Sequence, residues 1–312
     1  MAETVSYTPE EVAKLLKITR FTVYEMIKRG DLAAYRIGRK VRVEAPDLDV
    51  YIKKSKGISP PEALSADLGH PLYPASTQDA LIVCGQDVIL DIVARRFERI
   101  LPAIRFLRNG ASSLDGLLAL YRGTATAATA HLWDSDTDTY NLPYVRRFLP
   151  GHSALLVNLA YRMEGFYVAK GNPKNIATWK DLTLEAVRLV NREKGAGARI
   201  LLDEKLRVLA IDHRSIAGYD NEETSHLTVA SAVARGEADV GIGIEKTAQQ
   251  VNGIDFIPLQ KERLDLIIRK DDAARPHFQT LLSLLRSPDF HKEVRGVGGY
   301  DLSQTGEIVG ET

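Results

Sequence analysis

The residues near the amino terminus that could do chemistry are mostly cationic, and they are concentrated in one short stretch. Residues 13–43 contain 9 Lys and Arg residues against 2 acidic ones, a local charge of +7. The whole chain of 312 residues has 41 basic and 41 acidic residues and therefore no net charge. A basic cluster on a neutral chain favours an anionic partner for that cluster alone. A solvated charged surface is the other reading of the same counts.

Residue types that support catalysis do not form a recognisable set in this sequence. The single cysteine, Cys84, excludes an internal disulfide and a cysteine-based zinc finger, and a small core residue is its expected role. The seven histidines are scattered, and no Gly-x-Ser-x-Gly, His-Glu-x-x-His or Walker A sequence occurs. We therefore expect a protein that is not an enzyme and has no bound metal or cofactor.

The sequence shows no sign of membrane insertion or export. It has no run of 18 apolar residues, and its first residues, MAETVSYTPEE, lack the basic and apolar regions of a secretory signal. A single cysteine fits a reducing compartment. These observations predict a cytoplasmic protein without a membrane partner.

Two short helices are predicted to position the basic stretch. Thr8-Pro9-Glu10-Glu11 combines a capping Thr, a Pro in the first turn and a Glu three residues on, which is typical of a helix start. Apolar residues follow at helical spacing. Thr19 is expected to cap a second helix that ends at Gly30. Two helices separated by about three residues predict a helix-turn-helix.

A β-hairpin is predicted directly after the second helix. Two β-prone runs flank Gly38-Arg39, which is typical of a tight turn. Tyr35, Ile37, Val41 and Val43 alternate along the runs with Arg36, Lys40 and Arg42, so we expect one apolar and one basic face. A short helix beginning at Asp47 should follow the hairpin.

Residues 6–54, including TPEEVAKLLKITRFTVYEMIKRGDLAAYRIGRKVRV, resemble the excisionase-like branch of the winged MerR-type DNA-binding domains. The resemblance implies that the second helix enters the major groove of double-stranded DNA while the hairpin wing grips its backbone or minor groove. On this reading Arg20, Thr22 and Tyr24 reach base edges. The residues expected to meet phosphates are Lys28, Arg36, Arg39, Lys40 and Arg42.

A proline-rich segment separates this region from a longer one of different character. KGISPPEALSADLGHPLYPAST, residues 56–77, contains four prolines and predicts a linker. Residues 80–300 then alternate apolar strands with amphipathic helices, which predicts an α/β architecture with a parallel sheet. The elements expected in the second half include helices over 182–190 and 224–235 and strands over 207–211, 239–244, 256–259 and 264–268.

This second region resembles a family of solute-binding proteins. HLWD, GNPKNIATWKDL, VNREKGAGARILLD and IAGYDNEETSHLTVASAVARGEADVGIGI are similar to the cytoplasmic relatives of type II periplasmic binding proteins, and within them to the molybdate/tungstate-binding-like class. The resemblance implies two α/β lobes that enclose a ligand, with the chain crossing between them twice. We expect a winged helix-turn-helix domain at 1–56, a linker at 57–78 and a two-lobed domain at 79–302. Lobe one comprises 79–160 and 263–302, and lobe two comprises 161–262.

Binding in such clefts uses helix N-termini, whose unpaired N–H groups and dipole attract an anion. Hydroxyl, imidazole and guanidinium groups beside those N-termini would add donors, although each could also be an ordinary cap, core or surface residue. The residues expected to bind the solute are Gly85, Ser112, Ser113, His131, Gly197, Arg199, Tyr219, Ser225 and His226.

Two departures from the class leave the ligand open. Relatives often have Gly-Ser-Gly-Thr where this chain has Gly195-Ala196-Gly197-Ala198, and Asp87 lies near the expected cleft, where a carboxylate would repel an anion unless it acts as a cap. A pterin phosphate or an amino-acid-like solute is the alternative to molybdate or tungstate. The predicted function is a dimeric one-component transcriptional regulator that senses a small anionic solute and binds an operator. The alternatives are an excisionase-like architectural protein and a sensor or enzyme related to the molybdenum cofactor.

Overall fold

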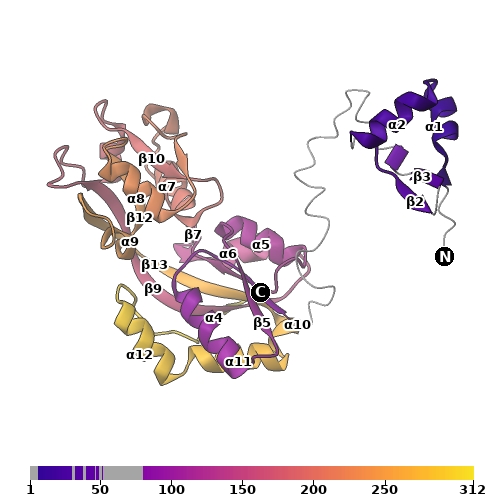
Figure 1. Ribbon diagram of the computed structural model, residues 1–312. Coiled ribbons are helices and arrows are strands. Elements are labelled where there is room, and N and C mark those ends of the chain that lie inside the picture. Colours follow the sequence, from indigo (N-terminus) through magenta and orange to yellow (C-terminus); the bar gives the residue numbers. More distant parts are fainter. Residues whose placement is uncertain (1–5, 30–31, 38–39, 46, 49–50, 52–79) are drawn as a thin grey trace. The chain divides into compact units, whose positions relative to one another are not determined.

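The computed structural model describes residues 6–29, 32–37, 40–45, 47–48, 51 and 80–312 (Figure 1). The chain divides into two compact units, Met1–Ala75 and Ser76–Thr312, and each is described by itself. The linker predicted at 57–78 lies outside the described residues, as does most of the short helix expected after Asp47.

The amino-terminal unit contains the predicted helix-turn-helix. Helix α1 (Pro9–Leu16) begins at a capping box formed by Thr8 and Glu11, and α2 (Arg20–Lys28) is capped by Thr19, whose hydroxyl accepts a hydrogen bond from the N–H of Thr22. The two helices pack on a small core whose fully buried members include Val12, Val23 and Val43. Both predicted helices are therefore confirmed, together with the caps that start them.

The hairpin wing is present, but its two faces differ from the prediction. Strands β2 (Tyr35–Ile37) and β3 (Lys40–Glu44) pair antiparallel, and β1 (Ser6–Tyr7) adds a third strand on the other side of β3. Tyr35 pairs with Arg42, so these two residues share a face, and Val43 lies on the opposite face, where it is buried. The expectation of one apolar and one basic face is wrong, because the register pairs Ile37 with Lys40 and Arg36 with Val41, so apolar positions of one strand lie opposite basic positions of the other.

The second unit is built on one mixed nine-stranded sheet. Its order is β11-β10-β12-β9-β13-β6-β4-β5, with β14 paired to β9 outside this path. The strands are β4 (Ala80–Cys84), β5 (Arg105–Asn109), β6 (Ala127–Ala130), β9 (Ala154–Ala169), β10 (Leu189–Arg192), β11 (Glu222–Glu223), β12 (Val240–Ile244), β13 (Ile254–Arg269) and β14 (Ile308–Glu311). Strands at both ends of the order run parallel, whereas β12, β9, β13 and β6 pair antiparallel. The prediction of a parallel sheet therefore holds for the outer strands and fails for the central ones.

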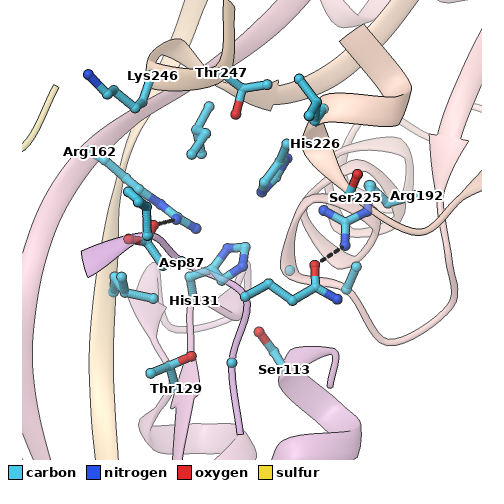
Figure 2. A pocket seen from close by; sticks show the side chains of 18 of the residues that line it. Asp87, Ser113, Thr129, His131, Arg162, Arg192, Ser225, His226, Lys246 and Thr247 are labelled. Atoms are coloured by element: carbon cyan, nitrogen blue, oxygen red, sulfur yellow. Dashed lines mark hydrogen bonds and ion pairs between the residues drawn. The ribbon is translucent and has the colours of Figure 1, made fainter. Parts of the chain in front are cut away.

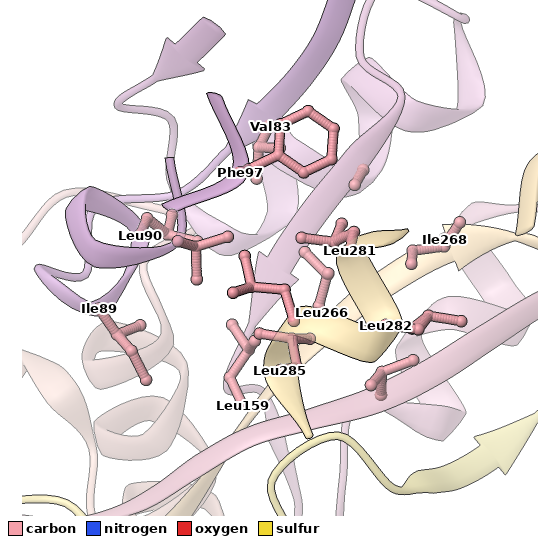
Figure 3. Close-up of a cluster of buried hydrophobic side chains, with 14 of the residues drawn as sticks. Val83, Ile89, Leu90, Phe97, Leu159, Leu266, Ile268, Leu281, Leu282 and Leu285 are labelled. Atoms are coloured by element: carbon pink, nitrogen blue, oxygen red, sulfur yellow. The ribbon is translucent and has the colours of Figure 1, made fainter. Parts of the chain in front are cut away.

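Strands β9 and β13 pass through two separate hydrophobic cores and so join two lobes (Figure 1). The core of lobe one packs helices α4 (Ile89–Ile100), α11 (Pro276–Leu285) and α12 (Pro288–Val297) against the sheet. Leu90, Phe97, Leu266 and Leu281 are among its buried members (Figure 3). The core of lobe two has parts on both sides of its strands. The chain thus crosses from one core to the other once along β9 and again along β13. Strand β14 extends lobe one beyond residue 302, where the sequence predicts its end.

The helices of this unit flank the sheet, and three of them start at a serine whose hydroxyl accepts a hydrogen bond from the first turn. They are α4 (Ile89–Ile100), α5 (Ser113–Tyr121), α6 (Leu142–Phe148), α7 (Gly197–Val208), α8 (His226–Ala234), α9 (Glu245–Ala248), α10 (Lys270–Ala273), α11 (Pro276–Leu285) and α12 (Pro288–Val297). A small hairpin, β7 (Trp133–Asp134) and β8 (Thr139–Tyr140), and two 3-10 turns, η2 (Trp179–Thr183) and η3 (His213–Ser215), complete the unit. Among the described residues, no helix is long and apolar enough to cross a membrane.

Two predicted elements of lobe two are wrong. The helix expected over 182–190 is η2 followed by strand β10, because the backbone of Leu189 and Val190 pairs with β12 in the sheet. The strand expected over 207–211 is the end of helix α7 and the turn after it. Ala198, Leu201, Leu202 and Leu206 give α7 a buried face at helical spacing, which a short β-prone run at its end obscures.

Candidate functional site

A cavity of about 210 Å³ lies between the two lobes, where the starts of several helices meet (Figure 2). Lobe one contributes the loop after β4 and the start of α5, and lobe two contributes the starts of α7, α8 and α9. Seven of the nine residues expected to bind a solute line it: Gly85, Ser112, Ser113, His131, Gly197, Ser225 and His226.

The helix starts supply hydrogen-bond donors to this cavity. The N–H groups of the first turn of an α-helix have no acceptor within the helix. Ser112 and Ser225 cap α5 and α8 through their hydroxyls, which use only one of those N–H groups in each case. Helix α7 begins at Gly197, its N-cap residue Ala196 provides no side-chain cap, and both residues line the cavity. Such an array favours an anionic guest.

The lobes touch along the loop that precedes α7. Gly195 accepts a hydrogen bond from the N–H of Leu114 at 3.1 Å, and Arg192 donates to Gln86 at 3.0 Å. A methyl group on Gly197 would lie 2.3 Å from the ring of His131, so only glycine allows this close approach. Gly197 is therefore required by contact between the lobes. The two lobes touch beside the cavity in this structure.

Three cations reach the cavity from lobe two and from the crossing strand β9. Arg192 is bound by its neighbour Glu193 at 2.7 Å and by Gln86. Lys246 donates to the carbonyl of Val297 in lobe one, and no carboxylate partner is recorded for it among the residues described. Arg162 lies deeper, in ion pairs with carboxylates. Lys246 thus places a positive charge at the edge of the cavity, with its ammonium group turned toward lobe one and away from His226 (Figure 2).

A chain of buried charges forms the floor of the cavity. The guanidinium of Arg162 binds both Asp87 and Glu262, and the second oxygen of Glu262 lies 2.8 Å from Nδ1 of His131. The hydroxyl of Tyr300 donates to Asp87 at 2.7 Å. Burial would raise the pKa of Glu262, but the charges of Arg162 and His131 hold it well below its usual range. Asp87 is therefore fully engaged, and its carboxylate does not face a guest as a free charge.

Two buried groups beside this chain accept no hydrogen bond from a donor in the described part of the protein. They are the carboxyl of Glu164, which faces the carboxyl of Glu262, and Nδ1 of His226. Burial, then the neighbouring Glu262, raises the pKa of Glu164 well above its ordinary value. Burial, then the charges of Arg192 and Arg162, lowers the pKa of His226 well below its ordinary value, so its imidazole is neutral. A neutral His226 can donate to or accept from a guest through its ring nitrogens.

Arg199 and Tyr219, the other two residues expected in the site, do not line the cavity. Arg199 is buried in α7, where it pairs with Asp203 and Glu222 and lies 4.2 Å from the ring of Tyr219. The hydroxyl of Tyr219 donates to Asp203 at 2.6 Å. These residues hold α7 to the segment before β11, and we do not include them in the ligand site.

Three charged residues of the floor, Arg162, Glu164 and Glu262, are not among the residues expected from the sequence. Arg162 and Glu164 stand in the otherwise apolar strand β9, and Glu262 stands opposite Arg162 on β13. Two charges of opposite sign inside a buried strand are a signal that could have identified them. Lys246 and Thr247 are harder to find, because α9 has only four residues and no clear periodicity.

The residues expected to bind DNA lie on α2 and the wing where the structure describes them. Arg20 is exposed but paired with Glu10 at 2.8 Å, Tyr24 is 37% exposed, and Thr22 contacts the hydroxyl of Thr19. Lys28 and Lys40 are exposed and Arg42 is half-buried. Arg39 and the side chain of Arg36 lie outside the described residues. Phe21, at the start of α2, is 74% exposed and was not expected.

Family models match both parts of the chain. A model described as a helix-turn-helix domain matches residues 6–56, and one described as a PBP superfamily domain matches residues 94–286. Neither describes an enzyme family. The predicted fold class, a helix-turn-helix region followed by a two-lobed α/β unit of the periplasmic-binding-protein kind, is confirmed.

Two curated relatives and two solved structures resemble the chain. The uncharacterized protein YvgK of Bacillus subtilis (strain 168) is 39% identical over 319 residues, which cover 100% of both chains. An uncharacterized protein in the 5' region of the ferredoxin 2Fe-2S gene of Clostridium pasteurianum is 57% identical over 112 residues, 36% of this chain and 99% of that protein. The tungstate ABC transporter structure from Geobacter sulfurreducens has a TM-score of 0.54 at 11% identity, covering 71% of this chain and 100% of its own. A phosphate-bound substrate-binding protein from Clostridium perfringens has a TM-score of 0.52 at 14% identity, covering 71% and 98%. At these identities the two structures show the fold alone.

Proposed function

Because the chain belongs to the PBP superfamily and carries a helix-turn-helix domain at its amino end, we propose that it is a one-component transcriptional regulator of the cytoplasm. Its two-lobed unit binds a small oxyanion, and its helix-turn-helix unit binds double-stranded operator DNA. The observation that carries the proposal is the cavity between the lobes, onto which the starts of α5, α7 and α8 converge.

The chemistry of the cavity supports an oxyanion as the guest. Ser113, Gly197 and His226 each occupy the first position of a helix and present N–H groups from both lobes. Lys246 places a positive charge at the edge of the cavity, and the hydroxyl of Ser113 points into the cavity (Figure 2). Donors from both lobes would stabilise the closed state when an anion bridges them. Molybdate and tungstate are the preferred candidates, since the motifs of the chain resemble that class and a tungstate transporter shares the fold.

Calorimetry of the full chain with molybdate, tungstate, sulfate and phosphate tests the ligand. One of these anions is expected to give saturable heat at a stoichiometry of about one per chain. Ser113→Ala and Lys246→Gln should each weaken binding about tenfold, because charged hydrogen bonds contribute about 1.5–3 kcal/mol. Lys180→Gln, at an exposed lysine of η2, is the matched control and should bind as the unaltered chain does. Heat with none of the four anions would refute the oxyanion assignment.

The regulatory part of the proposal rests on coupling between the two units. A solute that favours one geometry of the two-lobed unit by about 1–3 kcal/mol would change DNA affinity roughly 5–150-fold. A homodimer is proposed because two-fold operators pair with two-fold proteins. Duplexes selected from a random pool, titrated with and without the anion that binds, measure the effect. Unchanged affinity would instead favour an architectural DNA-binding protein.

A further inference from the structure

The floor of the cavity contains more negative than positive charge. Asp87, Glu164 and Glu262 are buried carboxyl groups, and Arg162 is the one guanidinium in ion-pair contact with any of them among the described residues. If all three carboxyls were ionised and His131 were neutral, the cluster would have a charge of −2. A buried charge excess of this size is expensive unless a cation or protons offset it.

We propose that His131, Glu164 and Glu262 bind a divalent transition-metal ion at the seam between the lobes, the region behind the cavity where strands β9 and β13 pass from one lobe to the other. Each of the three residues offers one ligand atom, and these atoms lie within 4.8 Å of one another. One imidazole and two carboxylates are a donor set that suits Zn²⁺ and the neighbouring first-row divalent ions. A divalent ion would also bring the charge of the cluster to zero.

Glu164 supplies the independent evidence that a ligand is missing. It is fully buried, no donor in the described part of the chain hydrogen-bonds to either of its carboxyl oxygens, and it faces the carboxyl of Glu262. Buried polar groups are nearly always satisfied, so two carboxyls that face each other beside a histidine require a proton or a cation between them. Glu164 lies on β9, diagonal to Glu262 on β13, and therefore faces the same seam.

The two carboxyl oxygens of Glu262 have different partners. Oε1 binds Nε of Arg162, and Oε2 lies 2.8 Å from Nδ1 of His131. Arg162 thus fixes the orientation of the carboxylate, as outer groups do in metal sites, and leaves Oε2 for the ion. His131 must move apart from Oε2 by a few tenths of an ångström, since two donors bound to one tetrahedral ion at about 2 Å lie roughly 3.3 Å apart.

The fourth position of the ion would face the cavity. His131 is both a ligand and part of the cavity lining, whereas Glu164 and Glu262 lie behind it. Three protein ligands with one open position are typical of sites where the ion also binds a water molecule or a guest. The metal site does not depend on the guest being an oxyanion, and it stands if none of the four anions binds.

Metal titration of the full chain tests the proposal. After dialysis against a chelator, Co²⁺ is added and its visible absorption followed, and Zn²⁺ binding is measured by calorimetry. We expect about one ion per chain, a Co²⁺ spectrum of four- or five-coordinate type, and a higher melting temperature with Zn²⁺. Glu164→Gln and His131→Gln should each weaken binding at least tenfold.

Controls separate a metal site from a pair of carboxyls that share protons. Glu185→Gln, at an exposed residue of lobe two, and His277→Gln, at a histidine in α11 of lobe one, should bind the ion as the unaltered chain does. If a variant fails to fold, the Co²⁺ spectrum and melting temperature of the unaltered chain still decide the matter. No ion bound by the unaltered chain, or equal affinity in a folded Glu164→Gln variant, would overturn the proposal.

Discussion

Replacing Gly197 by alanine should separate the two lobes. The added methyl group would lie 2.3 Å from Cε1 and Nδ1 of His131, whereas ordinary contact begins at 3.4 Å, so the ring or the loop must retreat by about 1.1 Å (3.4 minus 2.3). The ring has little freedom, because Nδ1 is bound to the buried Glu262. The loop before α7 is therefore the part expected to move, and its movement would lengthen the bond from Leu114 to Gly195.

The expected penalty follows from the size of this clash. Forcing one extra methyl group into a packed contact reduces stability by about 1–3 kcal/mol. The backbone of Gly197 lies at the start of a helix and is not in the left-handed region, so alanine adds no backbone strain. At about 1.4 kcal/mol per tenfold change, the closed arrangement should become roughly 5–150-fold less favoured.

Urea denaturation and amide hydrogen exchange measure the two possible outcomes. Gly197→Ala should lower the free energy of unfolding by about 1–3 kcal/mol, or the lobes should open and the amide of Leu114 should exchange faster. Gly296→Ala is the matched control, because it lies in α12 with no atom within 4 Å of its added methyl group. Equal unfolding free energies for both variants, with unchanged exchange at Leu114, would refute the reasoning.

Three other substitutions or measurements test separate parts of the structure. Arg162→Met should lower the free energy of unfolding by about 3–5 kcal/mol in urea titrations, because it leaves buried carboxylates without their cation; a loss below 1 kcal/mol would contradict the described ion pairs. Burial raises the pKa of Cys84 to about 11, so at pH 8 only about one thiol in a thousand is ionised. A disulfide reagent should therefore react with Cys84 only as the protein unfolds, and fast reaction in the folded state would show an exposed thiol. Lys40→Gln and Arg42→Gln should each reduce the slope of log K for DNA binding against log salt concentration by about 0.9, because each removes one phosphate contact. Lys180→Gln should leave this slope unchanged, and unaltered slopes in the two wing variants would remove the wing from the DNA interface.

Local sequence signals predict the elements that depend on local physics. The capping box at Thr8 and the cap at Thr19 start α1 and α2 as expected, and the apolar run at Ala80–Cys84 is a buried strand. Seven residues of the predicted ligand set line one cavity, because the start of a helix is a local property and the family resemblance supplies the long-range arrangement.

Properties that depend on tertiary contact could not be predicted in the same way. The segment Leu189–Arg192 becomes a strand because β12 and β11 lie beside it, and its own pattern favours a helix. Arg199 has the chemistry of an oxyanion clamp, but α7 turns it toward Glu222 and Tyr219. The faces of the wing depend on the length of its turn, which decides the register across the hairpin.

The continuity of β9 and β13 has a mechanical consequence. Each strand runs unbroken for 16 residues from one core to the other, and the two are hydrogen-bonded to each other along their length. The lobes are therefore joined by a continuous two-stranded β-ribbon and not by a flexible loop. Any opening of the lobes must twist and bend that ribbon. The pairing of the two strands is irregular at Pro258/Gln260 and at Leu264/Asp265, on either side of Glu262. The ribbon should bend most easily at these two positions. A guest that changes the curvature of the ribbon would thus deform the same few residues that hold the buried charges.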